Sequence, residues 1–178
     1  SWAGTAHAST SVRAPTIIKV PEAGHLDTQR GSVAAWFKRS SEGLAFPAVF
    51  HVGSLGVGSD RIGLWINNVN DTMGAHFDTN AVQVAANVPT PMLLNTWYFV
   101  YMAWDETHLW ASINNGSLVQ VPHQTPTGNI ESVNDFTIGT VGNSHQMNGL
   151  VGPLMVFNRP LTSDERAFLD AICECPDD

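Results

Sequence analysis

Four segments of this 178-residue chain alternate apolar and polar side chains. Residues 47–54, 61–68, 73–80 and 109–114 read PAVFHVGS, RIGLWINN, MGAHFDTN and LWASIN. Alternate side chains of a strand point to opposite faces, so each segment has an apolar face and a second face of another character. The second faces carry residues that could hold a ligand: His51, Arg61, Trp65, His76, Asp78 and Trp110.

These residue types favour a sugar as the ligand. An indole offers an apolar surface to a sugar ring, while imidazole, guanidinium and carboxylate groups hydrogen-bond to its hydroxyls. We therefore predict that Trp65, Trp110, His51, His76, Arg61 and Asp78 point outward and form a ligand site. The alternative is that each outward aromatic covers local apolar surface and that the histidines are ordinary polar residues.

Catalytic patterns are missing from the sequence. A retaining glycosidase needs two carboxyl groups about 5 Å apart, which same-face positions of one strand can supply. No glutamate here is followed two residues later by aspartate, and Asp78 is the acid expected inside a strand. The chain also has no G-x-S-x-G or H-E-x-x-H motif. We predict no catalytic residue and no enzyme activity.

Oxygen ligands for calcium gather at one turn. Residues 67–72 read NNVNDT, and Asp60 and Asp78 flank this region. Such groups could hold calcium. Asn and Asp are also the residues that turns prefer, because they tolerate left-handed backbone, and we favour that interpretation. No cofactor or resident metal is therefore predicted.

Charge and composition narrow the class of partner. Charged residues make up 13% of the chain, against about 25% in ordinary domains, and the net charge is -8. Nucleic acid is excluded as an expected partner because phosphate binding needs a basic stripe. No apolar run approaches the roughly 18 residues of a membrane span. A neutral polar surface suits hydrogen bonding to sugars or packing into an assembly.

Short strands separated by turns must position these residues. We expect strands at residues 16–20, 31–39, 48–52, 61–67, 74–78, 82–87, 97–104, 108–114, 117–121, 136–140 and 150–158. Trp36 is expected in the core of the second strand. Asn115-Gly116 predicts a two-residue hairpin turn, because both its central positions need positive φ. Thr162 and Glu165 form a capping box for a short helix that ends near Asp170. This order predicts an antiparallel sandwich.

The ends of the chain differ from the middle. Residues 1–15 are small and polar apart from Trp2, and predict an arm or linker. Cys173 and Cys175 lie two residues apart in a tail of residues 172–178. A bond between them would close a strained ring, so free thiols or links to another chain are favoured. Trp2, Cys173 and Cys175 are therefore candidate assembly contacts.

Residues 136–170 read FTIGTVGNSHQMNGLVGPLMVFNRPLTSDERAFLD. This ending resembles the laminin G-like family, also called the concanavalin A-like or pentraxin-like jelly roll. The resemblance extends to Trp36, to WYFVYMAWD at 97–105 and to HLWASINNG at 108–116. It implies an all-β jelly-roll sandwich over residues 16–171 with one C-terminal helix. The calcium-binding acids of the pentraxin branch have no counterpart at residues 140–143, which read TVGN.

Three functions follow, in order of preference. The first is a non-catalytic, adhesion-type module that binds carbohydrate, a glycoconjugate or a surface protein. The second is a structural subunit of a virion or cell-surface assembly, such as a decoration or fibre protein, that uses the arm and tail. The third is a glucanase of the same fold. An extracellular, cell-surface or virion location is expected, without membrane insertion.

Overall fold

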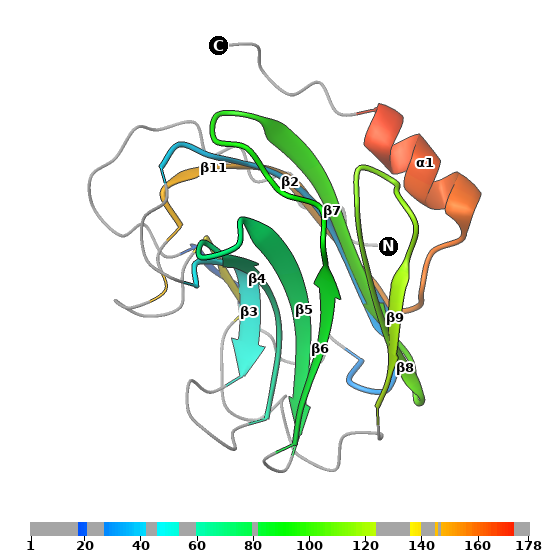
Figure 1. The fold of residues 1–178 in the computed structure, drawn as a ribbon. Coiled ribbons are helices and arrows are strands. Elements are labelled where there is room, and N and C mark those ends of the chain that lie inside the picture. The colour runs from blue at the N-terminus through cyan, green and yellow to red at the C-terminus, as the bar shows by residue number, and fades with distance from the viewer. Residues whose placement is uncertain are drawn as a thin grey trace.

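Two antiparallel sheets form the protein (Figure 1). The computed structural model describes residues 18–20, 27–41, 46–53, 60–79, 82–123, 136–139, 145 and 147–172. Sheet A has the strand order β1-β10-β3-β4-β5-β6, and sheet B has the order β11-β2-β7-β8-β9. This arrangement confirms the predicted β-sandwich with one C-terminal helix. No helix among the described residues is long and apolar enough to cross a membrane.

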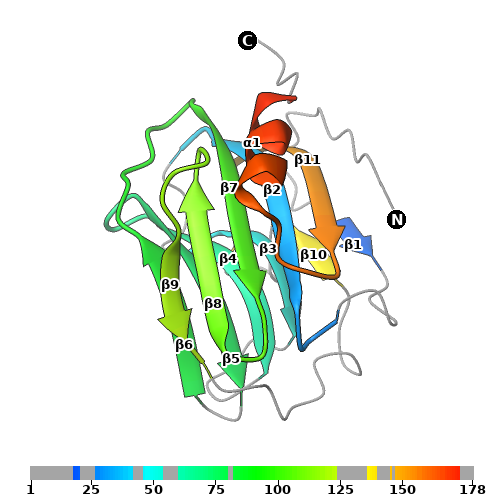
Figure 2. The ribbon, with the colours of Figure 1, turned by 90° about the vertical axis from the view of Figure 1, so that its right-hand side faces the viewer.

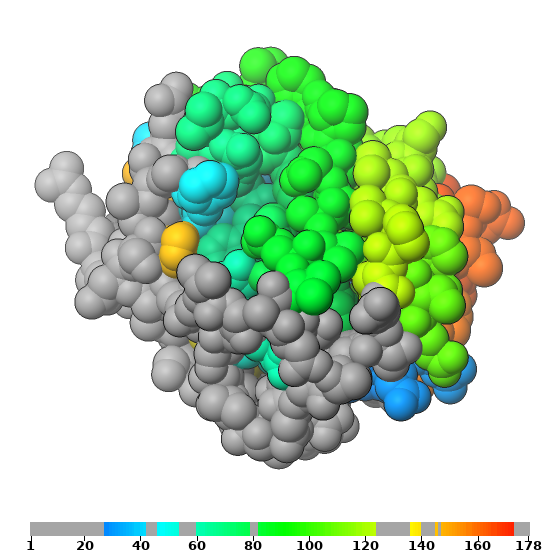
Figure 3. Space-filling model, turned by 60° about the horizontal axis from the view of Figure 1, so that its bottom comes forward, coloured from blue at the N-terminus to red at the C-terminus, as the bar shows by residue number. Residues whose placement is uncertain are grey.

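The strands lie close to the positions predicted from the sequence. Sheet A contains β1 Ile18–Val20, β3 Ala48–Gly53, β4 Arg61–Asn67, β5 Thr72–Thr79, β6 Val82–Val88 and β10 Phe136–Ile138. Sheet B contains β2 Gly31–Arg39, β7 Trp97–Trp104, β8 His108–Ile113, β9 Val119–Pro122 and β11 Gly149–Phe157. Figure 3 shows residues of β6, in green, beside the β8–β9 hairpin, in yellow-green, where the two sheets meet.

The main core lies between the sheets. It is built from the apolar alternate positions of both, with Ile62, Leu64 and Phe77 from sheet A facing Val33 and Trp104 from sheet B. A second cluster, on the outer face of sheet B, contains Ala34, Phe99, Tyr101, Ala103 and Leu161. The outer face of sheet A keeps a small apolar pair, Ala48 and Trp65. The two outer faces therefore differ in character.

Three local predictions were wrong. Positive φ falls on Asn114 and Asn115 rather than on Asn115 and Gly116, so the turn lies one residue earlier. Trp36 is half-buried against Phe99 on the outer face of sheet B, because its neighbours Ala35 and Phe37 take the core positions. Strict alternation along β3 would put Ala48 in the core with Phe50 and Val52. A bulge instead turns Ala48 toward Trp65, so that Val49 enters the core in its place.

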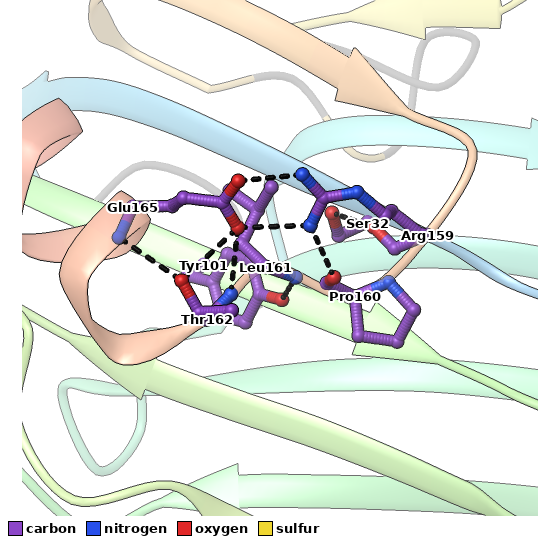
Figure 4. A network of polar contacts seen from close by, with 7 residues as sticks. All are labelled: Ser32, Tyr101, Arg159, Pro160, Leu161, Thr162 and Glu165. Atoms are coloured by element: carbon purple, nitrogen blue, oxygen red, sulfur yellow. Dashed lines mark hydrogen bonds and ion pairs between the residues drawn. The ribbon is translucent and has the colours of Figure 1, made fainter.

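Helix α1, Ser163–Ala171, lies on the outer face of sheet B (Figure 2). The predicted capping box is present: Thr162 Oγ1 accepts from the Glu165 backbone, and the Glu165 carboxylate accepts from the Thr162 backbone. The same carboxylate forms a bidentate pair with Arg159, at 2.8 Å and 2.5 Å (Figure 4). The Tyr101 hydroxyl accepts from the Leu161 backbone at 2.7 Å. These contacts fix the start of α1 to β7.

Arg39, at the end of β2, joins the two sheets. Its guanidinium is buried and donates to Asn68 Oδ1 at 2.9 Å, to the Asp71 carboxylate and to the carbonyl oxygen of Met92. Asn68 and Asp71 belong to the β4–β5 turn of sheet A, and the Arg39 carbonyl accepts from Asn95 N at 2.7 Å. One side chain of sheet B thus holds a turn of sheet A and the connection that precedes β7.

We expect Arg39→Met to lower the free energy of unfolding by about 3 kcal/mol, because it leaves a buried carbonyl and a turn carboxylate without their donor. Urea unfolding measures the change. The control is Asp71→Asn, which keeps an oxygen acceptor at a half-exposed position and should cost about 1 kcal/mol or less. Equal losses in the two variants would contradict the assignment of Arg39 as the joint between sheets.

The Arg159 pair holds the pKa of Glu165 at about 2, below its ordinary 4.5. The pair therefore stabilises the fold fully above about pH 4.5, and this contribution is lost as pH falls through about 2. We expect Glu165→Gln to differ most from wild type in urea midpoint near neutral pH and least at about pH 2. Asp164→Asn, on the same helical turn, is the control. A wild-type difference that stays constant over this range would contradict the prediction.

Candidate ligand-binding face of sheet A

Strand register brings five of the six predicted site residues together. His51 and His76 are both paired with Gly63, on either side of it, and Arg61 is paired with Asp78. Trp65 lies on the same side of β4 as Arg61, four residues further along, opposite Gly74. Their chain neighbours Ile62, Leu64 and Phe77 belong to the main core. The outer face of sheet A therefore carries one cluster: His51, Arg61, Trp65, His76 and Asp78.

Trp65 is at the centre of this cluster, but it is not an open stacking platform. Its exposed fraction is 6%. The rings of His51, His76 and His145 meet it edge-on, with centroids at 5.4 Å, 6.3 Å and 5.0 Å. The Arg61 guanidinium lies 5.8 Å from the indole centroid. We expected an outward indole with a face open to a sugar ring. That expectation was wrong, because the three imidazole rings and the Arg61 guanidinium cover the indole of Trp65.

Polar atoms of the cluster are incompletely satisfied. Asp78 Oδ2 accepts from Arg61 Nε. Within the described part of the chain, Asp78 Oδ1, His51 Nε2 and Trp65 Nε1 are buried without a hydrogen-bond partner. Each such group costs about 1–3 kcal/mol. Comparable atoms lie in sheet B and α1, where Trp36 Nε1, Trp97 Nε1 and Arg166 Nε are also buried without a partner, so these groups alone do not mark a functional face.

Both histidines of the cluster are held neutral. Burial, followed by the charges of Arg61 and His145, lowers the pKa of His51 to about 3. Burial also lowers the pKa of His76, against the opposing effect of Asp78. The formal charges of Arg61 and Asp78 offset one another. The cluster is consequently polar but close to uncharged at neutral pH.

Three residues next to the cluster were not predicted from the sequence: Gln83, Asn87 and His145. Gln83 and Asn87 extend the face onto β6, where they lie opposite Asp78 and Gly74, and both are exposed. The Gln83 amide lies 3.3 Å from His76 Nδ1. Alternation along β6 could have identified both residues, since positions 83, 85 and 87 share a side. His145 lies far along the chain from β4, and no local pattern marks it.

We call the exposed and half-buried part of this region the polar face: Arg61, His76, Gln83 and Asn87, with Trp65 beneath them. Gly63 and Gly74 have no side chains, so the side chains next to them can lie close to the sheet. A Cβ atom on Gly63 would lie 2.6 Å from Trp65 Nε1, so the indole leans over that glycine. The side chains therefore lie across the sheet, which leaves hydrogen-bonding groups at a shallow surface.

Trp110, the sixth predicted residue, lies elsewhere. It is in β8, on the outer face of sheet B, half-buried with Phe99 and Leu169 in the cluster beneath α1. Its ring is 5.6 Å from that of His108. The structure thus places Trp65 and Trp110 on opposite sides of the sandwich, and one ligand site cannot include both.

The predicted metal and assembly residues have different outcomes. In the turn at residues 67–72, Arg39 engages Asn68 and Asp71, so these oxygens serve the fold. The described residues contain no group of three or more His, Cys, Asp or Glu placed to hold a metal ion. Trp2, Cys173, Cys175 and the loop at residues 140–143 lie outside the described residues.

Comparisons with solved structures identify the same fold. The SAP-like pentraxin of Limulus polyphemus is 15% identical over 80% of this chain and 70% of its own, with a TM-score of 0.60. The CBM40 of a Ruminococcus gnavus IT-sialidase, bound to α2,3 sialyllactose, is 15% identical over 80% and 83%, with a TM-score of 0.61. The sialidase of Trypanosoma rangeli is 17% identical over 80% of this chain but 22% of its own, with a TM-score of 0.62.

No curated protein sequence matches this chain. The laminin G family model described as the concanavalin A-like lectin/glucanases superfamily matches residues 14–165. That match covers the two-sheet sandwich and the start of α1. The chain therefore belongs to the laminin G family of the concanavalin A-like lectin/glucanases superfamily.

Proposed function

We propose that this protein is a non-catalytic recognition module that binds carbohydrate, free or on a glycoconjugate, through the polar face of sheet A. The observation that carries the proposal is the cluster itself: Arg61, His76 and Asp78 lie around Trp65, and the exposed amides of Gln83 and Asn87 lie at its edge. An extracellular or surface location fits this role.

Chemistry favours a sugar over a peptide or a lipid. Guanidinium, imidazole and amide groups are donors and acceptors of the kind that sugar hydroxyls require. The charge of Arg61 in the polar face is offset by its ion pair with Asp78 beneath, so the face does not select a strongly charged partner. Arg61, His76, Gln83 and Asn87 come from three neighbouring strands, and rigid strands position binding groups more accurately than loops do.

Structural relatives support the class of function. The CBM40 is bound to a sialylated sugar, and the family description includes lectins. The same description includes glucanases. Asp78 is the one carboxylate among the described residues of the cluster around Trp65, and Arg61 pairs with it. Two carboxyl groups about 5 Å apart are needed for retaining glycoside hydrolysis, so binding without hydrolysis is the better-supported activity.

A glycan array tests the proposal. We expect His76→Ala and Arg61→Ala each to weaken binding about tenfold, the equivalent of about one hydrogen bond to the ligand. Trp65→Phe should also weaken binding, because the indole holds the histidines in place. Controls come from the opposite sheet: Trp110→Phe and Gln120→Ala, the latter an exposed glutamine of β9, should bind as wild type does.

The outcomes separate the candidate functions. Binding to no glycan, or binding that is indifferent to His76→Ala and Arg61→Ala, overturns the proposal. Loss of binding in the sheet B controls moves the site to the other face. Release of reducing sugar from β-glucans that disappears in Asp78→Asn would establish the glucanase alternative instead. Circular dichroism and thermal unfolding confirm that each variant is folded.

A second candidate function is assembly, as a subunit of a larger surface structure. One observation favours it: Phe168 and Ile172 at the end of α1 are 64% and 51% exposed. They are four residues apart and so share one side of the helix. Ile172 is the first residue of the tail at residues 172–178, which contains Cys173 and Cys175. An apolar helix side next to thiols is suited to contact with another chain.

Light scattering tests assembly in four forms: wild type with and without reductant, the chain without residues 1–15, and Phe168→Gln. We expect wild type to be larger than a monomer and Phe168→Gln to shift it toward monomer, because burial of an aromatic side chain contributes about 2 kcal/mol. Leu93→Gln is the control, since Leu93 is 67% exposed on a different segment. A strict monomer in every form contradicts an assembly role.

A further inference from the structure

Gly74 marks the place where two polar atoms of the polar face converge. A Cβ atom built on this glycine would lie 2.7 Å from Asn87 Oδ1 and 3.0 Å from His76 Nε2. Both atoms therefore lie over the same point of β5, at most 5.7 Å apart, the sum of those two distances. Asn87 is exposed and His76 is half-buried, so a ligand can reach the pair from solvent.

Gln83 determines which nitrogen of the His76 ring carries the proton. Its Nε2 lies 3.3 Å from His76 Nδ1. An amide nitrogen donates and does not accept, so Nδ1 must accept this hydrogen bond. The proton of the neutral ring is then on Nε2, which becomes a donor 3.0 Å from the position that a Cβ atom on Gly74 would take. Asn87 Oδ1 is an acceptor at the same point. One donor and one acceptor are thus presented side by side.

From this geometry we infer that Gly74, His76 and Asn87 form a subsite for one hydroxyl group of a neutral sugar, with Gln83 as its positioning residue. The hydroxyl accepts from His76 Nε2–H and donates to Asn87 Oδ1. The inference rests on the proposed carbohydrate-binding function and adds the ligand class. A hydroxyl satisfies both atoms because it carries one donor and two acceptor lone pairs.

An anionic sugar fits this subsite less well. An ionised carboxylate accepts hydrogen bonds and donates none, so it would satisfy His76 but face the oxygen of Asn87. Asp78, two residues after His76 on the same side of β5, adds a second negative charge, and Arg61 is already engaged with it. Sialic and uronic acids are therefore disfavoured as the group bound over Gly74, whereas neutral hexoses are favoured.

Gly74→Ala tests the subsite directly. The added methyl group would meet the ends of the His76 and Asn87 side chains, and these can shift without movement of the backbone. We expect this variant to stay folded and to bind about tenfold more weakly to neutral hexose-terminated glycans on the array. Asn87→Ala should have a similar effect, and Gln120→Ala should have none.

Gln83→Glu tests the positioning role with a readout that a purely structural role would not move. A carboxylate accepts from His76 Nδ1–H, so the neutral ring loses its donor at Nε2. Acidification restores that donor by forming the imidazolium. We expect Q83E to bind weakly at about pH 7.5 and to recover toward about pH 5.5, while wild type stays nearly constant. The ¹⁵N shifts of His76 report the tautomer in both proteins.

Each result has one meaning. Neutral hexoses bound by wild type and lost in Gly74→Ala, with the Nε2–H tautomer of His76, support the inference. Normal binding by Gly74→Ala, together with weak binding by Arg61→Ala, overturns the subsite and leaves the carbohydrate function standing. Selective binding of sialylated or uronic-acid glycans overturns the ligand class alone. Binding of no glycan overturns the proposed function itself, and the inference with it.

Discussion

The buried guanidinium of Arg39 is the interaction on which the arrangement of the two sheets depends. It lies at the end of β2 in sheet B and reaches Asn68 and Asp71 of the β4–β5 turn in sheet A. Hydrophobic contact between the sheets is non-directional, and it tolerates sliding of one layer over the other. A planar guanidinium with several fixed donors does not tolerate such sliding, because its hydrogen bonds have defined directions. Because β4 and β5 carry Arg61, Trp65 and His76, the same joint also fixes the position of the polar face relative to the core.

The outer faces of the two sheets differ in what covers them. Sheet B places Tyr101 and Phe99 under α1, and the capping box with the Arg159–Glu165 pair holds the helix there (Figure 4). Sheet A has no helix on its outer face among the described residues. Its outer positions are instead filled by histidines, charged residues and glycines around Trp65. One face is covered by α1, and the other keeps polar side chains at its surface, among them Arg61, His76, Gln83 and Asn87.

Much of the fold could be predicted from the sequence, because alternation is a local property. The bounds of β4 follow from it, whereas those of β2 and β7 follow from apolar runs between turns, and the cap at Thr162 follows from the spacing of Thr162 and Glu165. Alternation also predicts which residues share a face of one strand, and hence the association of Arg61 with Trp65. It does not say which sheet a strand joins. Trp110 was grouped with Trp65 for that reason, although β8 and β4 lie in different sheets. The bulge at Ala48 and the contact of His145 depend on long-range packing, which the local pattern does not contain.

Burial of Trp65 changes its role in the polar face. An exposed indole would act by stacking, and its contribution would depend on the ring of the ligand. Trp65 is 6% exposed, and three imidazole rings contact it edge-on. Its indole therefore lies beneath the polar side chains and fixes the orientation of the histidines. Glycine at positions 63 and 74 makes this possible, since a Cβ at either one would meet Trp65 Nε1 or the ends of His76 and Asn87. Recognition at such a surface depends on the direction of hydrogen bonds more than on apolar area. Under the proposed carbohydrate-binding function, the polar face should therefore discriminate between sugars by the orientation and charge of their substituents.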